Sequence, residues 1–156
     1  MHETAASDSD GEKRRGTAAH QAVQRIESGL IAVFAMTATI VIAPSLWWFP
    51  LAVFLAFDLS MLGYTRSPAA GAASYNAVHT YAWSAALGVA ALLTAAAAPT
   101  LSTWLALTAL AWAFHVGVDR MLGYGLKLPD AFTHTHLGAI GRTRDQSGQR
   151  SRTPAR

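Results

Sequence analysis

Cysteine is absent from this sequence of 156 residues. A chain without thiols cannot form a disulfide framework, a Cys-ligated zinc or iron–sulfur site, or a thiol nucleophile. Any chemistry that the protein performs must therefore use histidine, carboxylate or tyrosine side chains.

Charged residues are scarce in the middle of the chain. Between Gly29 and Leu126 the only residues with a formal charge are Asp58, Arg66, Asp119 and Arg120. The flanks carry nearly all of the lysines and arginines. A long apolar middle between polar ends is typical of an integral membrane protein.

The basic residues give the sequence a pI of about 9.7. They lie in tails next to apolar stretches, where membrane topology and anionic headgroups explain them better than nucleic acid does. We therefore expect the lipid bilayer as the partner and no nucleic acid, with a homo-oligomer as a further candidate.

Four apolar stretches are long enough to cross the hydrocarbon layer of a bilayer as helices. Prolines interrupt the chain between them, because proline disfavours helix at its own position and at the one before it. The expected helices span about 26–43, 47–64, 74–97 and 101–126. This pattern predicts an all-α fold, a four-transmembrane-helix bundle formed by residues 25–128.

The ends of the chain are polar, and we expect them to be disordered. Residues 1–24 form the expected N-terminal arm, residues 129–141 a cytoplasmic loop, and residues 142–156 a basic tail. Both ends and the central connection at Arg66 carry positive charge, whereas the other two turns carry none. The positive-inside rule then places both termini in the cytoplasm, in a multi-pass protein of the inner or plasma membrane.

Four ionisable residues are expected at one depth in this bundle. Counted at the helical rise, Asp58, His79, His115 and Asp119 lie about 7–14 Å from the cytoplasmic ends of their helices. His115 and Asp119 are four residues apart and share a helix face. Because ionisable groups are costly inside a membrane and usually functional there, we expect a polar site in the cytoplasmic third.

Imidazole and carboxylate groups on facing helices are the usual ligands of transition metals in helix bundles. The candidate catalytic residues are Asp58, His79, His115, Asp119 and Arg120, and the candidate metal ligands are His79, His115, Asp58, Asp119 and His136. Arg120 would hold an anionic headgroup. The absence of a Glu-x-x-His pair argues against a di-iron site, and two histidines on different helices could instead hold haem.

Three functions are compatible with such a cluster. It could be a metal-binding or acid–base site that acts on a membrane-soluble substrate, with a transition metal as the candidate cofactor. It could form a relay in an ion or proton transport subunit, or a structural layer in a non-catalytic membrane partner. For Arg120 the sequence favours a contact with Asp58 or a side chain that reaches toward the inner headgroups, and for Lys127 it favours a similar structural role.

Four separated motifs carry a family resemblance. They are Asp58–Tyr64, then Tyr75-Asn76 with His79-Thr80-Tyr81, then His115 with Asp119–Lys127, and finally Thr135–Gly138. In these motifs the sequence resembles a small bacterial membrane family designated domain of unknown function 4260, over roughly residues 26–141. The resemblance implies a compact multi-span bundle that contains the candidate site residues, and it implies no activity. His134 and the Arg-rich end lie outside these motifs, so we do not expect the tails to carry the core function.

Overall fold

The computed structural model describes residues 2–135 and 138–139. Its elements are α1 (His2–Ile42), η1 (Pro44–Leu46), α2 (Phe49–Ala52), α3 (Phe54–Asp58), η2 (Leu59–Thr65), α4 (Pro68–Val78), α5 (Tyr81–Thr94), α6 (Pro99–Leu122), β1 (His134–Thr135) and β2 (Gly138–Ala139). Four segments are long and apolar enough to cross a membrane: Gly16–Ile42, Pro44–Thr65, Pro68–Thr94 and Pro99–Leu122. The predicted all-α fold with four such segments is confirmed, and the described strands are a single antiparallel pair of two residues each.

The first helix is longer than the sequence predicts. We expected a polar arm over residues 1–24, whereas the structure continues α1 back to His2. This stretch is rich in Ala, Glu, Lys and Arg, which favour helix, and contains no proline. The predicted tail over residues 142–156 lies outside the described residues.

The second apolar segment is not the single helix predicted for residues 47–64. Val53 interrupts it between α2 and α3 with φ −91° and ψ 0°, and Leu59–Thr65 is a 3-10 helix. The tighter winding leaves backbone groups less well paired. One of them, the Ser60 carbonyl, accepts a hydrogen bond of 2.7 Å from the Ser74 hydroxyl on α4.

The third apolar segment is also divided, where the sequence predicted one helix over residues 74–97. It begins earlier, at Pro68, because the Ser67 hydroxyl caps α4 by accepting from the Ala70 amide at 3.1 Å. The helix then stops at Val78. Thr80 is extended, and its hydroxyl caps α5 by accepting from the Ala82 amide at 3.3 Å.

The last long helix ends before the predicted residue 126. Gly123 follows α6 with φ 98°, a left-handed conformation that glycine adopts without strain. The Tyr124 amide donates to the Asp119 carbonyl at 2.8 Å and closes the helix end. The chain therefore turns away from the helix axis before it reaches Lys127.

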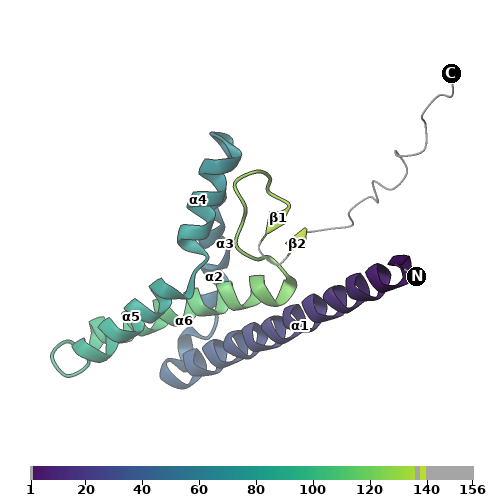
Figure 1. Ribbon diagram of the computed structural model, residues 1–156. Helices are drawn as coiled ribbons and strands as arrows, with labels where there is room; N and C mark the ends of the chain where they lie inside the picture. The colour runs from purple at the N-terminus through teal and green to yellow at the C-terminus, as the bar shows by residue number, and fades with distance from the viewer. Residues whose placement is uncertain (1, 136–137, 140–156) are drawn as a thin grey trace.

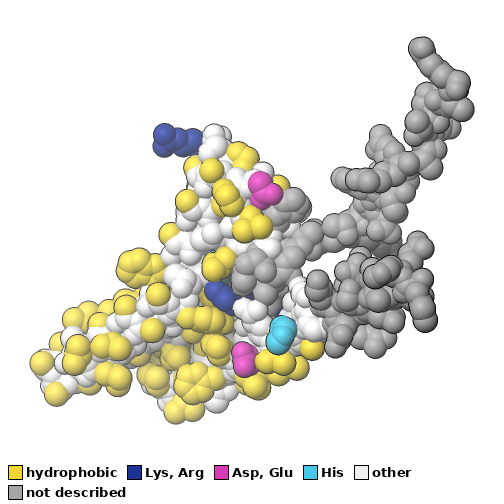
Figure 2. All heavy atoms as spheres, in the orientation of Figure 1, with side chains coloured by type: hydrophobic (Ala, Val, Ile, Leu, Met, Phe, Trp, Pro, Cys, Tyr) yellow, Lys and Arg dark blue, Asp and Glu magenta, His cyan; other side chains and the backbone are white. Residues whose placement is uncertain are grey.

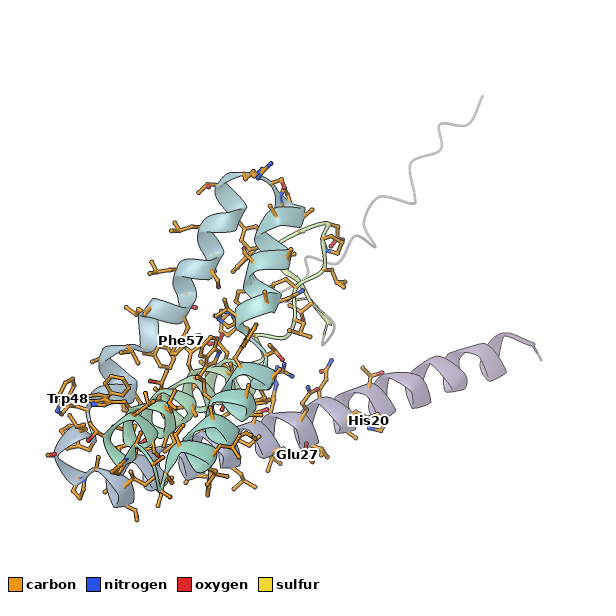
Figure 3. All side chains as sticks on the ribbon, turned by 90° about the vertical axis from the view of Figure 1, so that its left-hand side faces the viewer. His20, Glu27, Trp48 and Phe57 are labelled. Atoms are coloured by element: carbon orange, nitrogen blue, oxygen red, sulfur yellow. The ribbon has the colours of Figure 1, made fainter. Side chains whose placement is uncertain are left out.

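These breaks produce two groups of helices (Figure 1). α1, α5 and α6 lie in a lower layer, whereas η2 and α4 form a hairpin that stands across it (Figure 1). Figure 3, turned by 90°, shows the same upright hairpin above the lower layer. Hydrophobic side chains cover most of the visible surface of that layer (Figure 2), as expected for helices that face lipid.

Small residues let α1 and α6 approach closely. A Cβ atom at Gly117 would lie 2.8 Å from the Ser28 carbonyl oxygen and 3.0 Å from the Ala32 amide nitrogen, both on α1. Ala35 and Ala111, on the two helices, are completely buried. Close backbone approach of this kind is a main source of helix association in membranes.

We expect Gly117→Ala to destabilise the protein by about 1–3 kcal/mol, because the added methyl group meets backbone that cannot move independently. Gly88→Ala is the matched control, since a Cβ atom on this α5 glycine would meet nothing within 4 Å. Thermal unfolding of the purified variants in detergent measures the difference. Equal midpoints for the two variants would contradict the close approach of α1 and α6.

A candidate metal centre of two histidines and two aspartates

Four side chains converge where the upright hairpin meets the lower layer. Asp58 ends α3, His79 follows α4, and His115 and Asp119 lie one turn apart on α6. Each offers one ligand atom, and these atoms all lie within 4.8 Å of one another. The sequence places these residues at one depth, and the structure brings them into a single cluster.

The break between α4 and α5 puts His79 into this cluster. It also frees carbonyl groups that the helix would otherwise pair, and unpaired backbone groups are not tolerated in lipid. Three long side chains donate hydrogen bonds to these carbonyl groups. The Trp83 indole donates to the Ala77 carbonyl at 2.8 Å, the Trp112 indole to the Val78 carbonyl at 2.8 Å, and the Arg120 guanidinium to the His79 carbonyl at 3.4 Å.

The His79 ring is fixed on one face and at one nitrogen. Its Nδ1 lies 3.0 Å from the Tyr75 carbonyl oxygen. The Tyr75 ring stacks on it with centroids 3.6 Å apart. With its proton on Nδ1, His79 donates to this carbonyl and directs the lone pair of Nε2 into the cluster, as metal-binding histidines usually do.

His115 meets His79 nitrogen to nitrogen. The two Nε2 atoms are 3.0 Å apart, and the His115 side chain is completely buried against Phe54 and Phe57. A contact of this length between two imidazole nitrogens has room for a single hydrogen between them. Both lone pairs can also point at one shared cation.

The carboxylates complete the cluster on its more open side. His79 Nε2 lies 3.5 Å from Asp58 Oδ1 and 3.4 Å from Asp119 Oδ2. The corresponding distances from His115 Nε2 are 3.7 and 3.8 Å. The Asp58 and Asp119 side chains are 33% and 14% exposed. The Tyr75 hydroxyl donates to Asp119 Oδ2 at 3.0 Å and orients this carboxylate.

These distances suit a four-coordinate ion. Ligands held about 2.0–2.2 Å from a tetrahedral centre lie roughly 3.3–3.6 Å from one another. The nitrogen–nitrogen and nitrogen–oxygen distances of the cluster, 3.0–3.8 Å, lie close to this range. Imidazole and carboxylate are ligands of zinc, manganese and iron, so the cluster offers a ligand set that suits a divalent transition metal.

A cavity of about 450 Å³ lies beside the cluster. It is lined by Phe54, Asp58, Met61, Tyr75, Asp119, Leu122, Tyr124, Lys127 and Phe132. Both aspartates of the cluster border it, and most of the other lining residues are apolar. A molecule in this cavity would therefore lie next to the carboxylate side of the cluster.

Lys127 is a site residue that the sequence does not reveal. Its side chain is 3% exposed, not turned toward solvent as we expected. Burial lowers the pKa of its ammonium group below the usual value, while the negative charge of Asp119 acts in the opposite direction. Asn76 holds the backbone of Lys127 with two hydrogen bonds. The Asn76 side-chain amide nitrogen donates to the Lys127 carbonyl oxygen at 2.8 Å, and the Lys127 backbone amide donates to Asn76 Oδ1 at 2.7 Å.

Two of the predicted site residues are not part of the described cluster. Arg120 lies behind it, with its guanidinium on the His79 carbonyl and 5.2 Å from the Tyr81 ring centroid. His136 lies outside the described residues. The signal that could have indicated Tyr75 is its position four residues before His79, one helical turn away.

The comparisons with known proteins place the chain in a family. A family model described as "Domain of unknown function (DUF4260)" matches residues 21–140. The chain belongs to this family. The match covers all four residues of the cluster and confirms the resemblance seen in the four sequence motifs. No curated protein and no solved structure matched the chain.

We expect Trp112→Phe to destabilise the fold by about 1 kcal/mol, because the Val78 carbonyl loses its indole donor. Trp104→Phe is the matched control, since this α6 tryptophan is 48% exposed and makes the same change in size. Thermal unfolding in detergent compares the two. A larger loss for Trp104→Phe would show that ring volume, not the hydrogen bond, stabilises the break.

Proposed function

We propose that this member of the family is a multi-pass protein of the bacterial inner membrane that binds one divalent transition-metal ion. The ligands are Asp58, His79, His115 and Asp119. The ion serves chemistry on a membrane-soluble substrate that enters the adjacent cavity. The observation that carries the proposal is the convergence of four ligand atoms within 4.8 Å, from three separate segments of the chain.

Charge supports a cation in this cluster over a purely structural layer. Two ionised carboxylates carry a charge of −2. The distance of 3.0 Å between the histidine nitrogens leaves room for a single hydrogen, so the two imidazoles cannot both be protonated there to balance this charge. Uncompensated charge is costly at this depth. A divalent ion between neutral imidazoles and two carboxylates balances the ligands without any proton in the centre.

The position of the cavity supports a reactive site. An ion held by the cluster would polarise a bound water or a substrate oxygen on the side of the aspartates, where the cavity lies. A carboxylate that borders both ion and cavity can also accept or return a proton. Asp58, the more exposed of the two at 33%, is the better placed for this role.

The membrane orientation follows from the distribution of basic residues. Lys13, Arg14, Arg15 and Arg25 precede or begin the first apolar segment, and Lys127 follows the last. The turns at Pro44 and Pro99 carry no charge. We therefore infer that both termini and the cluster lie on the cytoplasmic side.

The sequence gives less support to a transport subunit. The stretches from Leu30 to Phe57 and from Trp83 to Phe114 contain no Asp, Glu, His, Lys or Arg. They account for the half of the apolar segments that lies away from the cluster. A side-chain relay of protons across the bilayer needs ionisable groups there, so we favour the metal site.

We expect the purified protein to hold about one metal ion per chain, since four ligands complete one tetrahedral site. The double variant His79→Ala with His115→Ala should lose it. Elemental analysis of protein prepared without a polyhistidine tag, after dialysis against Zn²⁺, Mn²⁺ or Fe²⁺, measures the content. His20→Ala is the matched control, because this exposed histidine of α1 lies away from the cluster (Figure 3).

A wild-type protein without stoichiometric metal would overturn the proposed function. Normal metal content in the double variant would do the same. The cluster is a structural layer if neither wild-type protein nor the double variant holds metal and the double variant differs only by a lower unfolding temperature.

We expect Tyr75→Phe to lower metal affinity about 10- to 100-fold, the usual effect of removing a group that orients a ligand. The change deletes the hydroxyl that donates to Asp119 Oδ2 and keeps the ring that stacks on His79. Tyr64→Phe is the control, because the Tyr64 hydroxyl has no hydrogen-bond partner among the described residues. Competition with a chromophoric chelator measures both affinities, and equal values would show that the Tyr75 hydroxyl does not support metal binding through Asp119.

A further inference from the structure

A buried cation that borders the cavity has no polar partner among the residues that the structure describes. The Lys127 side chain is 3% exposed, and its Nζ has no hydrogen-bond partner among the described residues. A buried ammonium group has three donors to satisfy and is costly when they are left unpaired. An anion in the cavity would supply the missing acceptor.

Aromatic rings surround this ammonium group. Nζ lies 3.9 Å from the ring centroid of Phe132, 5.1 Å from that of Tyr75 and 5.4 Å from that of Tyr124. Cation–π contacts compensate part of the lost hydration but satisfy no donor in hydrogen-bond geometry. Phe132 follows α6 in the chain and is 38% exposed.

The backbone of Lys127 is fixed independently of its side chain. Asn76 binds both the amide and the carbonyl of Lys127. The side chain therefore starts from a constant position relative to α4, which also leads into His79. Such a pair of backbone hydrogen bonds is expected where a cation has to be positioned relative to the cluster.

The rest of the cavity suits an apolar chain. Phe54, Met61 and Leu122 line it together with Phe132. Leu122, at the end of α6, is 59% exposed, so this wall continues onto the surface that faces lipid. A volume of about 450 Å³ is in the range of small-molecule sites.

We propose that the cavity binds a singly charged anionic amphiphile, a long-chain carboxylate, with its head group on Lys127 and its chain along Phe54, Met61 and Leu122. This inference rests on the proposed function, because a divalent ion neutralises Asp58 and Asp119 and leaves the charge of Lys127 for the substrate. The carboxylate then lies between the lysine and the metal ligands. In this way the structure assigns a substrate class to the metal site.

A single lysine favours a carboxylate over a phosphate. A phosphate group carries a charge of about −1.5 to −2 near neutral pH and is usually met by several basic groups. Within the described cavity lining, Lys127 is the one basic residue. Arg120 is engaged with the His79 carbonyl, and Arg66 lies exposed at the tip of the hairpin.

The test compares ligands with one chain and different heads. Zinc-loaded protein in nanodiscs of neutral phospholipid is incubated with radiolabelled dodecanoate, dodecyl phosphate or dodecanol in mildly alkaline buffer, and retention by empty nanodiscs is subtracted. We expect dodecanoate to bind most tightly. Lys127→Met should weaken it about tenfold to a hundredfold, as for loss of a charge-assisted hydrogen bond, and leave dodecanol unchanged.

Two further variants control for unspecific effects. Arg66→Met removes an exposed positive charge at the hairpin tip and should leave all three affinities unchanged. Met61→Trp fills the apolar part of the cavity and should weaken dodecanoate and dodecanol equally. Metal content is measured on every sample, and Lys127→Met should keep it, because Lys127 is not a ligand.

The outcomes separate the two proposals. Protein that holds metal but binds dodecanol as tightly as dodecanoate overturns the inference and leaves the proposed function intact. Tighter binding of dodecyl phosphate overturns the choice of a carboxylate. Protein that holds no metal overturns the proposed function. If the protein does hold metal, its removal with a chelator should weaken the binding of dodecanoate and leave the binding of dodecanol unchanged.

Discussion

The cluster depends on a backbone that leaves its helix inside an apolar segment. At His79 and Thr80 the chain abandons the helical hydrogen bonds, which in lipid is tolerated only when other groups replace them. Two indoles and a guanidinium do so, and they come from α5 and α6. The packing of these helices against the break therefore fixes the direction of His79, and with it the distance to His115.

This arrangement explains why aromatic and basic residues gather around the site without touching its ligands. Trp83 and Trp112 bind consecutive carbonyls of the chain that leads to His79. Arg120 binds the His79 carbonyl itself. Their role is to hold the backbone, whereas the cluster atoms contact one another, through the two histidine nitrogens, and the Tyr75 hydroxyl.

The sequence predicted that the four site residues share one layer, but not the course of the backbone that brings them there. Prolines bound the apolar stretches and the helical rise is constant, so counting from the ends put Asp58, His79, His115 and Asp119 in one layer. The break at His79 carries no proline or glycine, and hydrophobicity alone does not distinguish a broken segment from a continuous one.

Lys127 was misjudged for a related reason. A basic residue at the end of an apolar helix usually extends toward headgroups. Gly123 turns the chain back with φ 98° before Lys127 is reached, and Asn76 then holds that segment against α4. Such a return depends on contacts between residues far apart in the chain, which no local pattern encodes.

The division of the third apolar segment also concerns the bilayer itself. α5 has 14 residues, which is a length of about 21 Å, whereas the hydrocarbon layer is about 30 Å thick. α6 beside it has 24 residues and is long enough. A bilayer crossed by both would meet a hydrophobic mismatch on the side of α5, and lipids adapt to a short helix by local thinning. Headgroups drawn inward there would stand beside the His79 end of the helix, so the protein would thin the membrane next to the cluster.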